Sequence, residues 1–513
     1  MSNFNKTNST KTKNHEGAVA YTMPLKEELV SMVVSSFLQD TFYESTDERT
    51  ARLSALVAQV AKTDPEFVAK LAVYARKQMY LRTVPVVLVV ELAKHHSGDN
   101  LVSRAVTQIV ERVDDMTELL AYYAISNSRT EFKKLHKLSN QIKIGLQTAF
   151  LKFDAYQFGK YNRDKTVTVK DVLFLSHIKP ETPEQTALFD QIVNDTLPTP
   201  DTWETAVSKD GNIAAVWERL INENKLGYMA LLRNLRNILQ ANVSLATVEK
   251  VVAKLTKPEA VLKSKQLPFR FFSAYRELQA VSNQYVSSVM QALDTAANLS
   301  AKENVPWLSP DKSYFLAVDV SGSMEGTLSP KSKVSYKDVA LLQAATVAHV
   351  CKNFTLGMFA ERFGVVNIAS GSPVCSTVTG LKNQSNNYGG ATNGYLVLEH
   401  LIKNNLKYRY VIFFTDCQLY NSATGMMYYQ AYDQSFNKLW TEYKRMNPDA
   451  EMIIFNLAGY ATTPVSVNRE DVTQISGWSD RIYDLLNSRE FSTVVEKVEA
   501  QVVWYNSCKG GVG

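Results

Sequence analysis

The sequence predicts a multidomain protein with an all-α array of HEAT-like helical repeats, followed by an α/β domain with a mainly parallel sheet. Three observations support this. The length of 513 residues is too great for one hydrophobic core. From residue 21 to about 300, apolar residues recur at spacings of three and four, which is typical of helices that bury one face. After residue 313, apolar runs of strand length alternate with helical patterns, which indicates parallel strands with helices on both faces.

The helical region can be followed element by element. Its first helices are predicted over residues 25–38, 46–60, 65–78 and 84–95. Asp64-Pro65 is a helix-opening pair, because proline lacks a donor that the first turn does not need. Further helices are predicted over residues 100–113, 116–126, 131–150, 169–175, 183–193, 213–222, 225–240, 244–255 and 269–293. Short polar breaks between them favour stacked helix pairs over a single bundle.

The pattern changes near residue 300, where serines and prolines predict a linker. Strands are then predicted over residues 313–319, 354–359, 408–415, 450–457 and 472–476, and helices over residues 337–351, 393–403, 435–445, 480–486 and 491–503. As domains, we expect a flexible N-terminal arm (1–20), a helical module (21–298), a linker (299–312), an α/β domain (313–508) and a flexible tail (509–513).

Composition predicts an ordinary globular protein of the cytoplasm. The apolar fraction is 45% and the charged fraction is 21%. No run approaches the ~20 apolar residues that cross a bilayer, and the N-terminal segment lacks the apolar core of a secretory signal. The net charge of +5 does not by itself identify a nucleic-acid binder. The cysteines lack zinc-site spacing and are expected to be reduced thiols: Cys351, Cys375, Cys417 and Cys508.

Oxygen-bearing side chains follow two apolar strands of the predicted sheet. Asp319 ends one strand and is followed by Ser321 and Ser323. Asp416 ends a second strand, and Thr392 stands in a glycine-rich loop between them. All five oxygens should lie at the carboxyl ends of parallel strands, where α/β sheets carry their sites. Short hydroxyl and carboxylate side chains there suit a hard divalent cation, for which we expect Mg²⁺. The alternative is a turn that binds no metal.

This DxSxS pattern, with a later threonine and a strand-terminal aspartate, resembles the von Willebrand factor A domain and its metal-ion-dependent adhesion site. The resemblance implies five cation ligands: Asp319, Ser321, Ser323, Thr392 and Asp416. It also implies that the hydroxyls touch the metal and that the aspartates often act through water. Many such domains have glycine where this chain has Cys417, which leaves the shape of that loop open.

Basic residues of the helical region cluster beside aromatic residues. Arg76 and Arg82 flank one loop, residues 152–170 interleave basic residues with Phe and Tyr, and Arg233 and Arg236 lie three apart on one helix face. Guanidinium groups bind phosphates while aromatic rings stack on unpaired bases, a combination that suits single-stranded RNA. Solvated helix faces and core aromatics produce the same composition, so both explanations stay open.

Several of these segments resemble the TROVE module of the Ro autoantigen family: residues 73–77, 81–85, 158–161, 171–177, 225–237 and 268–270. The Arg-Asn-Leu-Arg-Asn block that begins at Arg233 is the most specific of them. With the A-like domain behind it, the resemblance covers nearly the whole chain. It implies a ring of HEAT-like repeats clasped by the A domain. It further implies that Y RNAs bind the outer surface and that single-stranded 3′ ends of misfolded RNAs enter a basic central hole.

The resemblance also implies roles for single residues. Lys160 and His177 match positions that contact Y RNA, and Arg163 lies close to a third such position. Candidates for the hole are Arg233, Arg236 and Arg270, and the candidate RNA-binding set also includes Arg76 and Arg82. Without the resemblance, a histidine at a helix end such as His177 is more often a cap or a surface residue.

The leading hypothesis is a protein that binds non-coding RNA, in RNA quality control or as an RNA–protein scaffold. Its expected partners are Y RNA-like small RNAs, misfolded or single-stranded RNA ends and, by resemblance, an exoribonuclease, without a membrane. The alternative is a metal-dependent protein-interaction scaffold that binds no RNA. Catalysis is not expected, because the chain has no GxxxxGK[ST], GxSxG or HExxH motif. Phosphatases with a strand-end aspartate need a second carboxylate where this chain has Ser321.

Overall fold

The structure is a computed structural model that describes residues 9–35, 41, 43–129, 138–161, 166–304, 311–329, 332–422, 429–477 and 494–503. It divides into two compact units. A sheet-containing unit comprises residues 1–49 and 206–491, and a helical unit comprises residues 50–205 and 492–513. These units differ from the predicted division at residue 298, because the helices after residue 206 belong to the same compact unit as the sheet.

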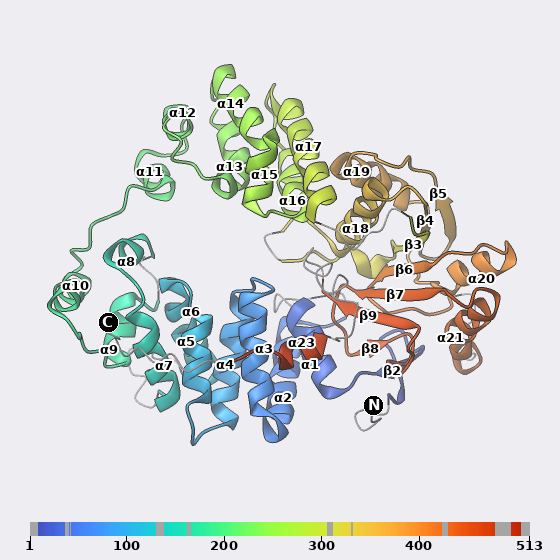
Figure 1. The fold of residues 1–513 in the computed structure, drawn as a ribbon, viewed down its shortest axis with the longest axis horizontal. Helices are drawn as coiled ribbons and strands as arrows, with labels where there is room; N and C mark the ends of the chain where they lie inside the picture. The colour runs from blue at the N-terminus through green and yellow to red at the C-terminus, as the bar shows by residue number, and fades with distance from the viewer. Residues whose placement is uncertain are drawn as a thin grey trace. The chain divides into compact units, whose positions relative to one another are not determined.

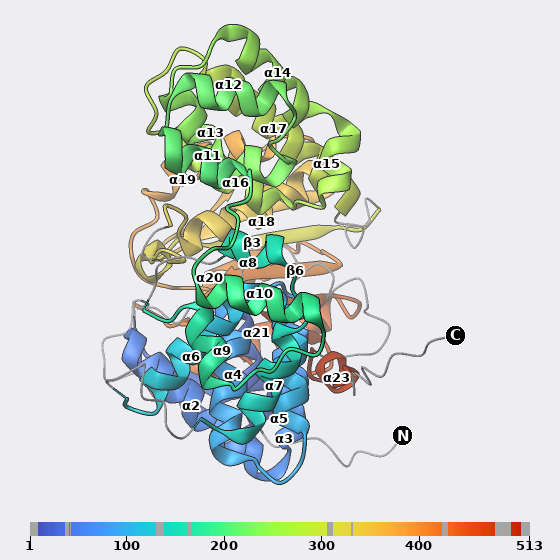
Figure 2. The same cartoon turned by 90° about the vertical axis from the view of Figure 1, so that its left-hand side faces the viewer.

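Helices of the helical unit pack on the helices one or two places along the chain (Figures 1 and 2). Its main elements are α3 (Pro65–Lys77), α4 (Thr83–His95), α5 (Leu101–Ile109), α6 (Val113–Ser126) and α7 (Asn140–Phe150). α3 contacts α4 and α5, α4 contacts α6, and α5 contacts α7, which is the packing expected of stacked helix pairs. α2 (Thr46–Thr63) precedes them, and α8 (Ala155–Tyr161), α9 (Val169–Leu175) and α10 (Pro183–Val193) follow.

Local signals set the ends of several helices. The Asp64 side chain accepts a hydrogen bond from the Phe67 amide at 3.0 Å, and Pro65 opens α3 as predicted. The short helix α23 (Val494–Glu499) packs on α3 in the helical unit. The prediction that these residues belong to the α/β domain is therefore wrong. The sequence pattern of residues 494–499 predicts a helix whether it packs on α3 or on the sheet, so it does not reveal the packing partner.

α11 (Trp203–Asp210) spans the boundary between the two units. The helices that follow it in sequence and precede the sheet are α12 (Ala214–Asn222), α13 (Tyr228–Gln240), α14 (Leu245–Thr256), α15 (Pro258–Ser264), α16 (Pro268–Leu278) and α17 (Val286–Asn304). The helix predicted over residues 269–293 is two helices, α16 and α17. Asn283 marks the break, since its side chain accepts from the Tyr285 amide at 2.8 Å and donates to the Leu239 carbonyl at 2.9 Å. α17 also runs to Asn304, into the predicted linker.

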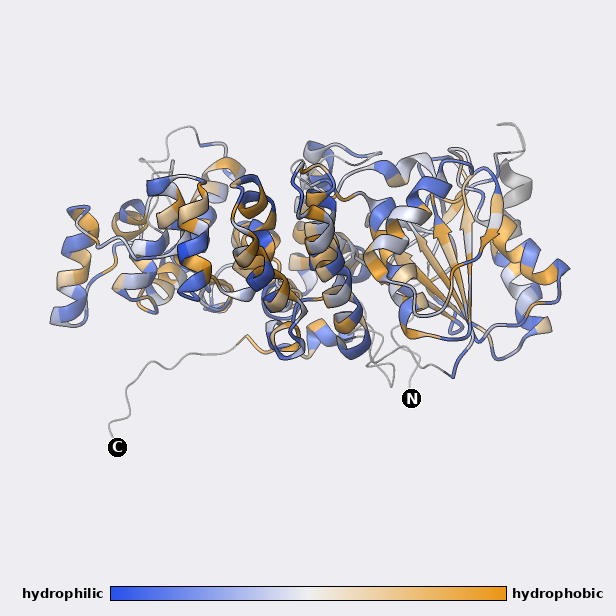
Figure 3. Ribbon diagram, turned by 90° about the horizontal axis from the view of Figure 1, so that it is seen from above, coloured by the Kyte–Doolittle hydropathy of each residue, from blue (hydrophilic) through white to orange (hydrophobic). Residues whose placement is uncertain are grey.

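Among the described residues, one sheet has the strand order β5-β4-β3-β6-β7-β9. The strands are β3 (Tyr314–Asp319), β4 (Phe354–Phe359), β5 (Phe363–Val366), β6 (Tyr410–Thr415), β7 (Glu451–Asn456) and β9 (Val472–Ser476). Neighbours are parallel except β5, which pairs antiparallel with β4 and was not predicted. In Figure 3 the sheet is coloured as hydrophobic along most of its strands, as expected for a sheet covered on both faces.

Helices cover the two faces of this sheet (Figure 1). α18 (Tyr336–Val350) contacts β3 and β6, with α19 (Val374–Ser385) packed on it. α20 (Tyr395–Lys403) and α21 (Tyr429–Met446) cover the other face. The predicted fold class, a helical part followed by a mainly parallel, von Willebrand factor A-like sheet, is confirmed.

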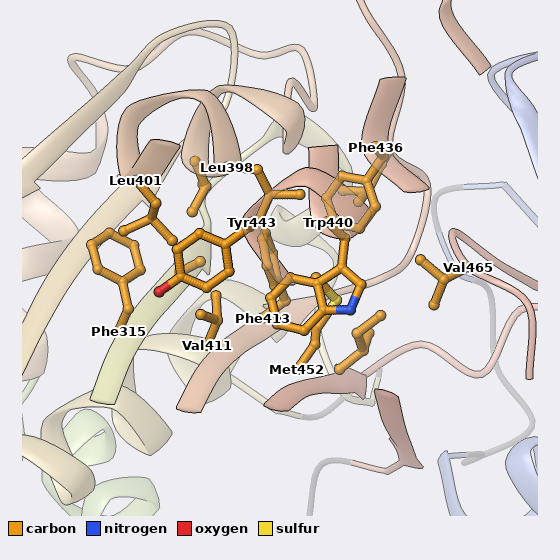
Figure 4. Packing of buried hydrophobic residues seen from close by; sticks show 14 of the residues in the cluster. Phe315, Leu398, Leu401, Val411, Phe413, Phe436, Trp440, Tyr443, Met452 and Val465 are labelled. Carbon is orange, nitrogen blue, oxygen red and sulfur yellow. The ribbon is translucent and has the colours of Figure 1, made fainter. Parts of the chain in front are cut away.

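Side chains that alternate along the strands of the sheet form a hydrophobic core beneath α20 and α21. Phe315 and Phe413 point to this face from neighbouring strands and pack against Trp440 and Leu398 (Figure 4). The Trp440 indole donates to Asp471 at 2.9 Å, so its one polar atom is satisfied. This rigid layer holds the carboxyl ends of β3 and β6 side by side.

The N-terminal residues form structure of their own, so the prediction of a loose arm is wrong for the part that the structure describes. β1 (Lys11–Lys13) and β2 (Val19–Thr22) pair as an antiparallel hairpin, and β2 pairs with β8 (Thr462–Thr463). α1 (Leu25–Ser35) follows and contacts β9. The predicted tail over residues 509–513 lies outside the described residues. Among the described helices, none is both long and apolar enough to cross a membrane.

Candidate functional site

Two neighbouring strands deliver the predicted cation ligands to one edge of the sheet. β3 and β6 are parallel and in register at Val318 and Phe414, so Asp319 and Asp416 emerge close together. Both carboxylates are buried, with 0% and 1% exposure. Ser321 and Ser323 lie directly after β3, and their hydroxyls are 3.3 Å apart.

The Thr392 loop lies against the loop that follows β3. The Gly322 amide donates to the Gly390 carbonyl at 3.0 Å, which joins the two loops. Thr392 itself is 2% exposed, and its carbonyl accepts from the Tyr420 amide at 3.1 Å. The structure thus brings the segments that carry all five predicted ligands to one place.

The two carboxylates are held in fixed positions. Asp319 accepts from the Ser321 amide at 3.0 Å and from the Thr415 hydroxyl at 2.6 Å. One Asp416 oxygen accepts from the Gln418 amide at 3.0 Å. The other, Oδ2, is buried and has no hydrogen-bond partner among the residues that the structure describes.

Burial makes both negative charges costly. Burial, followed by the nearby charge of Asp319, raises the pKa of Asp416 to about 7. Burial also raises the pKa of Asp319. An orphaned carboxylate oxygen beside a second buried carboxylate and two hydroxyls fits a divalent cation, whose charge would offset both. In the described part of the chain no three or more His, Cys, Asp or Glu side chains are placed so that they could hold a metal ion. The predicted set differs in kind, because three of its five members are hydroxyls.

Cys417 shows how the loop accommodates a residue other than glycine. Its φ is 67°, in the left-handed region that glycine adopts at least cost, and its side chain is buried. The loop therefore keeps the backbone conformation that glycine favours. The Cys417 amide donates to the Thr415 hydroxyl at 3.1 Å, which secures this conformation.

Three predicted RNA-binding arginines meet around one pocket of the sheet-containing unit. Arg233 and Arg236 on α13 and Arg270 on α16 line a cavity of about 320 Å³, and all three are exposed. Arg236 pairs with Glu277 at 2.8 Å. The Arg270 guanidinium lies 6.0 Å from the centre of the Phe269 ring.

The asparagines of the Arg-Asn-Leu-Arg-Asn block have a structural role. Asn234 is 3% exposed and donates to the Ala230 carbonyl at 2.8 Å, and Asn237 donates to the Asn234 side chain at 3.1 Å. The helical period therefore turns the two arginines outward and Asn234 inward. This is the orientation that phosphate binding by the arginines requires.

The predicted Y RNA contacts lie in the helical unit. Lys160 is on α8 and His177 follows the end of α9, and both helices pack on α6. His177 is exposed with a φ of 54°, and its amide donates to the Phe174 carbonyl at 3.2 Å, so it ends the helix as expected from its sequence position. Phe174 is 54% exposed nearby in sequence. Arg163 lies outside the described residues.

Arg76 and Arg82 have partners that give them a structural role. Arg76 is 5% exposed, and its guanidinium contacts Asp115 at 2.5 Å and Glu111 at 3.4 Å. Arg82 contacts Asp114 at 3.1 Å and Asp115 at 3.4 Å. A buried arginine held by carboxylates at the start of a helix joins helices together. We therefore remove Arg76 from the candidate RNA-binding set, while the prediction for Arg82 remains.

Lysines of the 152–170 cluster also have a role that the sequence did not reveal. Lys152 donates to the Thr107 and Val110 carbonyls at the end of α5, and Lys170 donates to the Val193 carbonyl at the end of α10. Cations there satisfy carbonyls that lack helical partners. No signal in the local sequence distinguishes such lysines from phosphate-binding ones.

Comparisons with known proteins agree with this architecture. The family profile described as the TROVE domain matches residues 22–196 and 195–289. Telomerase protein component 1 from Rattus norvegicus is 25% identical over 319 residues, which cover 47% of this chain and 12% of the relative, and its Mus musculus counterpart is 24% identical over the same length and shares. The chain thus spans only a small part of these relatives. The crystal structure of the Deinococcus radiodurans Ro (Rsr) protein matches with a TM-score of 0.61 and 16% identity, over 90% of this chain and 99% of that one, and so shares the fold.

Proposed function

This chain belongs to the TROVE-domain family, and on that premise we propose that it binds RNA without cleaving it. The observation that carries the proposal is the pocket between α13 and α16, where Arg233, Arg236 and Arg270 converge. Three exposed guanidinium groups suit the phosphate backbone of a single strand, since arginine binds phosphate through charge-assisted hydrogen bonds. The pocket volume of about 320 Å³ lies within the range of small-ligand sites.

The ligand that we propose for this pocket is a single-stranded 3′ end, as in misfolded RNA. Guanidinium contacts to phosphate carry little sequence information, so binding should tolerate many sequences and weaken with salt. For Lys160 and His177 we propose a structured, Y RNA-like small RNA. An exoribonuclease is the partner protein that we propose from the family resemblance, with this chain holding RNA for degradation by that enzyme.

The cation site has a separate proposed role. Asp319, Ser321, Ser323, Thr392 and Asp416 would hold Mg²⁺, which would supply positive charge for a carboxylate ligand. The contacts of Asp319 and Asp416 fix the positions of both carboxylates. We propose no reaction at this site.

RNA binding is tested with a triple variant and a charge-matched control. Arg233→Gln, Arg236→Gln and Arg270→Gln are combined in one protein, and three exposed cations of the α/β part are combined in the control: Lys403→Gln, Lys438→Gln and Arg445→Gln. Electrophoretic mobility shifts with a single-stranded RNA are measured across salt concentrations. The triple variant should reduce the slope of log affinity against log salt by roughly two, because each phosphate contact on a single strand contributes about 0.7.

The control variant separates specific contacts from net charge. It should keep the wild-type slope and affinity to within about twofold. Equal losses of RNA affinity and salt slope in both variants would show that only overall charge matters. That result would refute the proposal that RNA binds in the pocket. If wild-type protein binds neither single-stranded nor structured RNA at low salt, the alternative stands, which is a metal-dependent protein-interaction scaffold.

A further inference from the structure

A turn near the N-terminus is fastened to the cation site. The Asn14 side chain donates to the Leu419 carbonyl at 2.9 Å, and the His15 amide donates to the Gln418 side chain at 2.9 Å. The Gln418 amide in turn donates to Asp416 at 3.0 Å. The turn at residues 14–18 therefore sits on the loop that directly follows a predicted cation ligand, within the same compact unit.

The turn itself is rigid. Asn14 is 8% exposed, and its side-chain oxygen accepts from the Glu16 amide at 3.1 Å and from the Ala18 amide at 3.0 Å. Gly17 has a φ of +77°, which a residue with a Cβ rarely adopts. The β1–β2 hairpin on either side, and its pairing with β8, hold the ends of the turn. The backbone of Glu16 is thus fixed beside the site.

Tyr43 connects Glu16 to the predicted ligands. Its phenol donates to the Glu16 carboxylate and lies near Ser323 and Asp416. Its ring stacks on His15 at 5.1 Å and meets Tyr460 edge-on at 5.5 Å, so the ring is held on two sides. Burial, then the bond to Glu16 and the charge of Asp416, raise the pKa of Tyr43, so the phenol stays a donor at neutral pH. Through this phenol, Glu16 is one hydroxyl away from the cation ligands.

We propose that Glu16 is an internal carboxylate of the cation site, held by Tyr43, which covers the position where an external carboxylate would otherwise bind. Asp416 Oδ2 is a buried acceptor without a hydrogen-bond partner among the described residues, and the negative charge of Glu16 is close enough to act on the same carboxyl. A bound divalent cation would attract Glu16 through its water molecules, since Mg²⁺ keeps several of them. The same negative charge would repel a carboxylate from another protein.

In this arrangement Glu16 occupies the position of an external carboxylate while no partner is bound. A partner would have to displace the turn at residues 14–18 before its own carboxylate could approach. The inference rests on the cation site and is independent of RNA binding.

The test uses the full chain and Mn²⁺ as the probe. Mn²⁺ affinity is measured by titration for wild type, Glu16→Gln, Tyr43→Phe and Glu399→Gln. Glu16→Gln should lower the affinity about tenfold, since it removes a negative charge that acts on the Asp416 ligand. Tyr43→Phe keeps the ring but loses the phenol, and should lower it less. Glu399 is an exposed acid on α20 away from the hairpin, so Glu399→Gln controls for net charge and should have no effect.

Added acetate provides a second readout. In wild type, acetate should change neither the Mn²⁺ affinity nor the proton relaxation rate of the water bound to Mn²⁺. In Glu16→Gln, acetate should bind to the Mn²⁺-loaded site and lower that relaxation rate. Circular dichroism of each variant verifies folding. If Glu16→Gln binds Mn²⁺ with wild-type affinity and responds to acetate as wild type does, the proposal that Glu16 is an internal carboxylate is refuted. The proposed cation site would be unaffected by that result. Absence of Mn²⁺ binding in wild type would overturn both, and RNA binding would be unaffected.

Discussion

Asp294 joins a helix of the TROVE part to a helix of the α/β part, and its replacement should be strongly destabilising. Its side chain on α17 is 8% exposed. Its two carboxylate oxygens accept from the Cys375 amide at 2.7 Å and from the Ser376 amide at 3.1 Å. These amides belong to the first turn of α19, where Pro373 provides no side-chain cap. Asp294 therefore caps α19 from another helix.

The expected loss of unfolding free energy follows from these contacts. A hydrogen bond to a charged group contributes about 1.5–3 kcal/mol, and a carboxylate at a helix N-terminus adds about 0.3–1 kcal/mol. Asp294→Ala would also leave the buried Cys375 amide and the partly buried Ser376 amide without this acceptor. We expect it to lower the free energy of unfolding by about 3–5 kcal/mol. Asp294→Asn keeps one acceptor oxygen and should cost about 2 kcal/mol.

The assay is urea unfolding followed by circular dichroism, with hydrogen exchange of residues 374–385 as a local probe. Thr295→Ala is the control, because Thr295 is exposed and bonds only within its own helix, to the Gln291 carbonyl at 3.0 Å. It should change stability by no more than about 0.5 kcal/mol. A loss below about 1 kcal/mol for Asp294→Ala, with unchanged exchange in α19, would refute this reasoning.

Three more predictions concern buried groups. Because burial and a neighbouring carboxylate raise the pKa of Asp416 above its value in the unfolded chain, the fold favours the protonated carboxyl, and the cation-free protein should lose stability as pH rises from about 4 towards 7. Asp416→Asn in EDTA should reduce this loss in denaturation curves at several pH values, and the remaining loss would come from Asp319, whose pKa burial also raises. Arg76→Ala removes one of the two arginines that contact the buried Asp115, and should cost about 1.5–3 kcal/mol in unfolding free energy without altering the salt slope of RNA binding. Gly459→Ala should cost at least about 2 kcal/mol in the same unfolding assay, because its φ is +68° and a Cβ would lie 1.7 Å from the Ser35 hydroxyl.

Local patterns were enough to predict most elements of secondary structure. The strand predicted over 408–415 corresponds to Tyr410–Thr415, and the helix predicted over 337–351 corresponds to Tyr336–Val350. Each depends on a period of apolar residues and on ending signals close in sequence. The helix break at Asn283 was missed, because its side chain bonds to the Leu239 carbonyl of a different helix.

The cation-ligand segments were predictable for a topological reason. Strands β3 and β6 both end in aspartate, and parallel neighbours end at the same edge of a sheet, so Asp319 and Asp416 had to lie close together once the alternation of elements was recognised. The convergence of Arg270 with Arg233 was not implied by spacing. It depends on the packing of α16 against α13.

The amino-acid sequence alone determined the order of helices and strands, the outward face of Arg233 and Arg236, and the convergence of the strand-end oxygens of the proposed cation site, because each follows from residues near one another or from parallel topology. Only the tertiary structure decided which charges are available. It pairs Arg76 with Asp115, and it docks Asn14 on Leu419, 405 residues away, so that the turn carrying Glu16 lies on the loop that follows Asp416. Pairing across such separations depends on the packing of the whole unit, which no local period encodes.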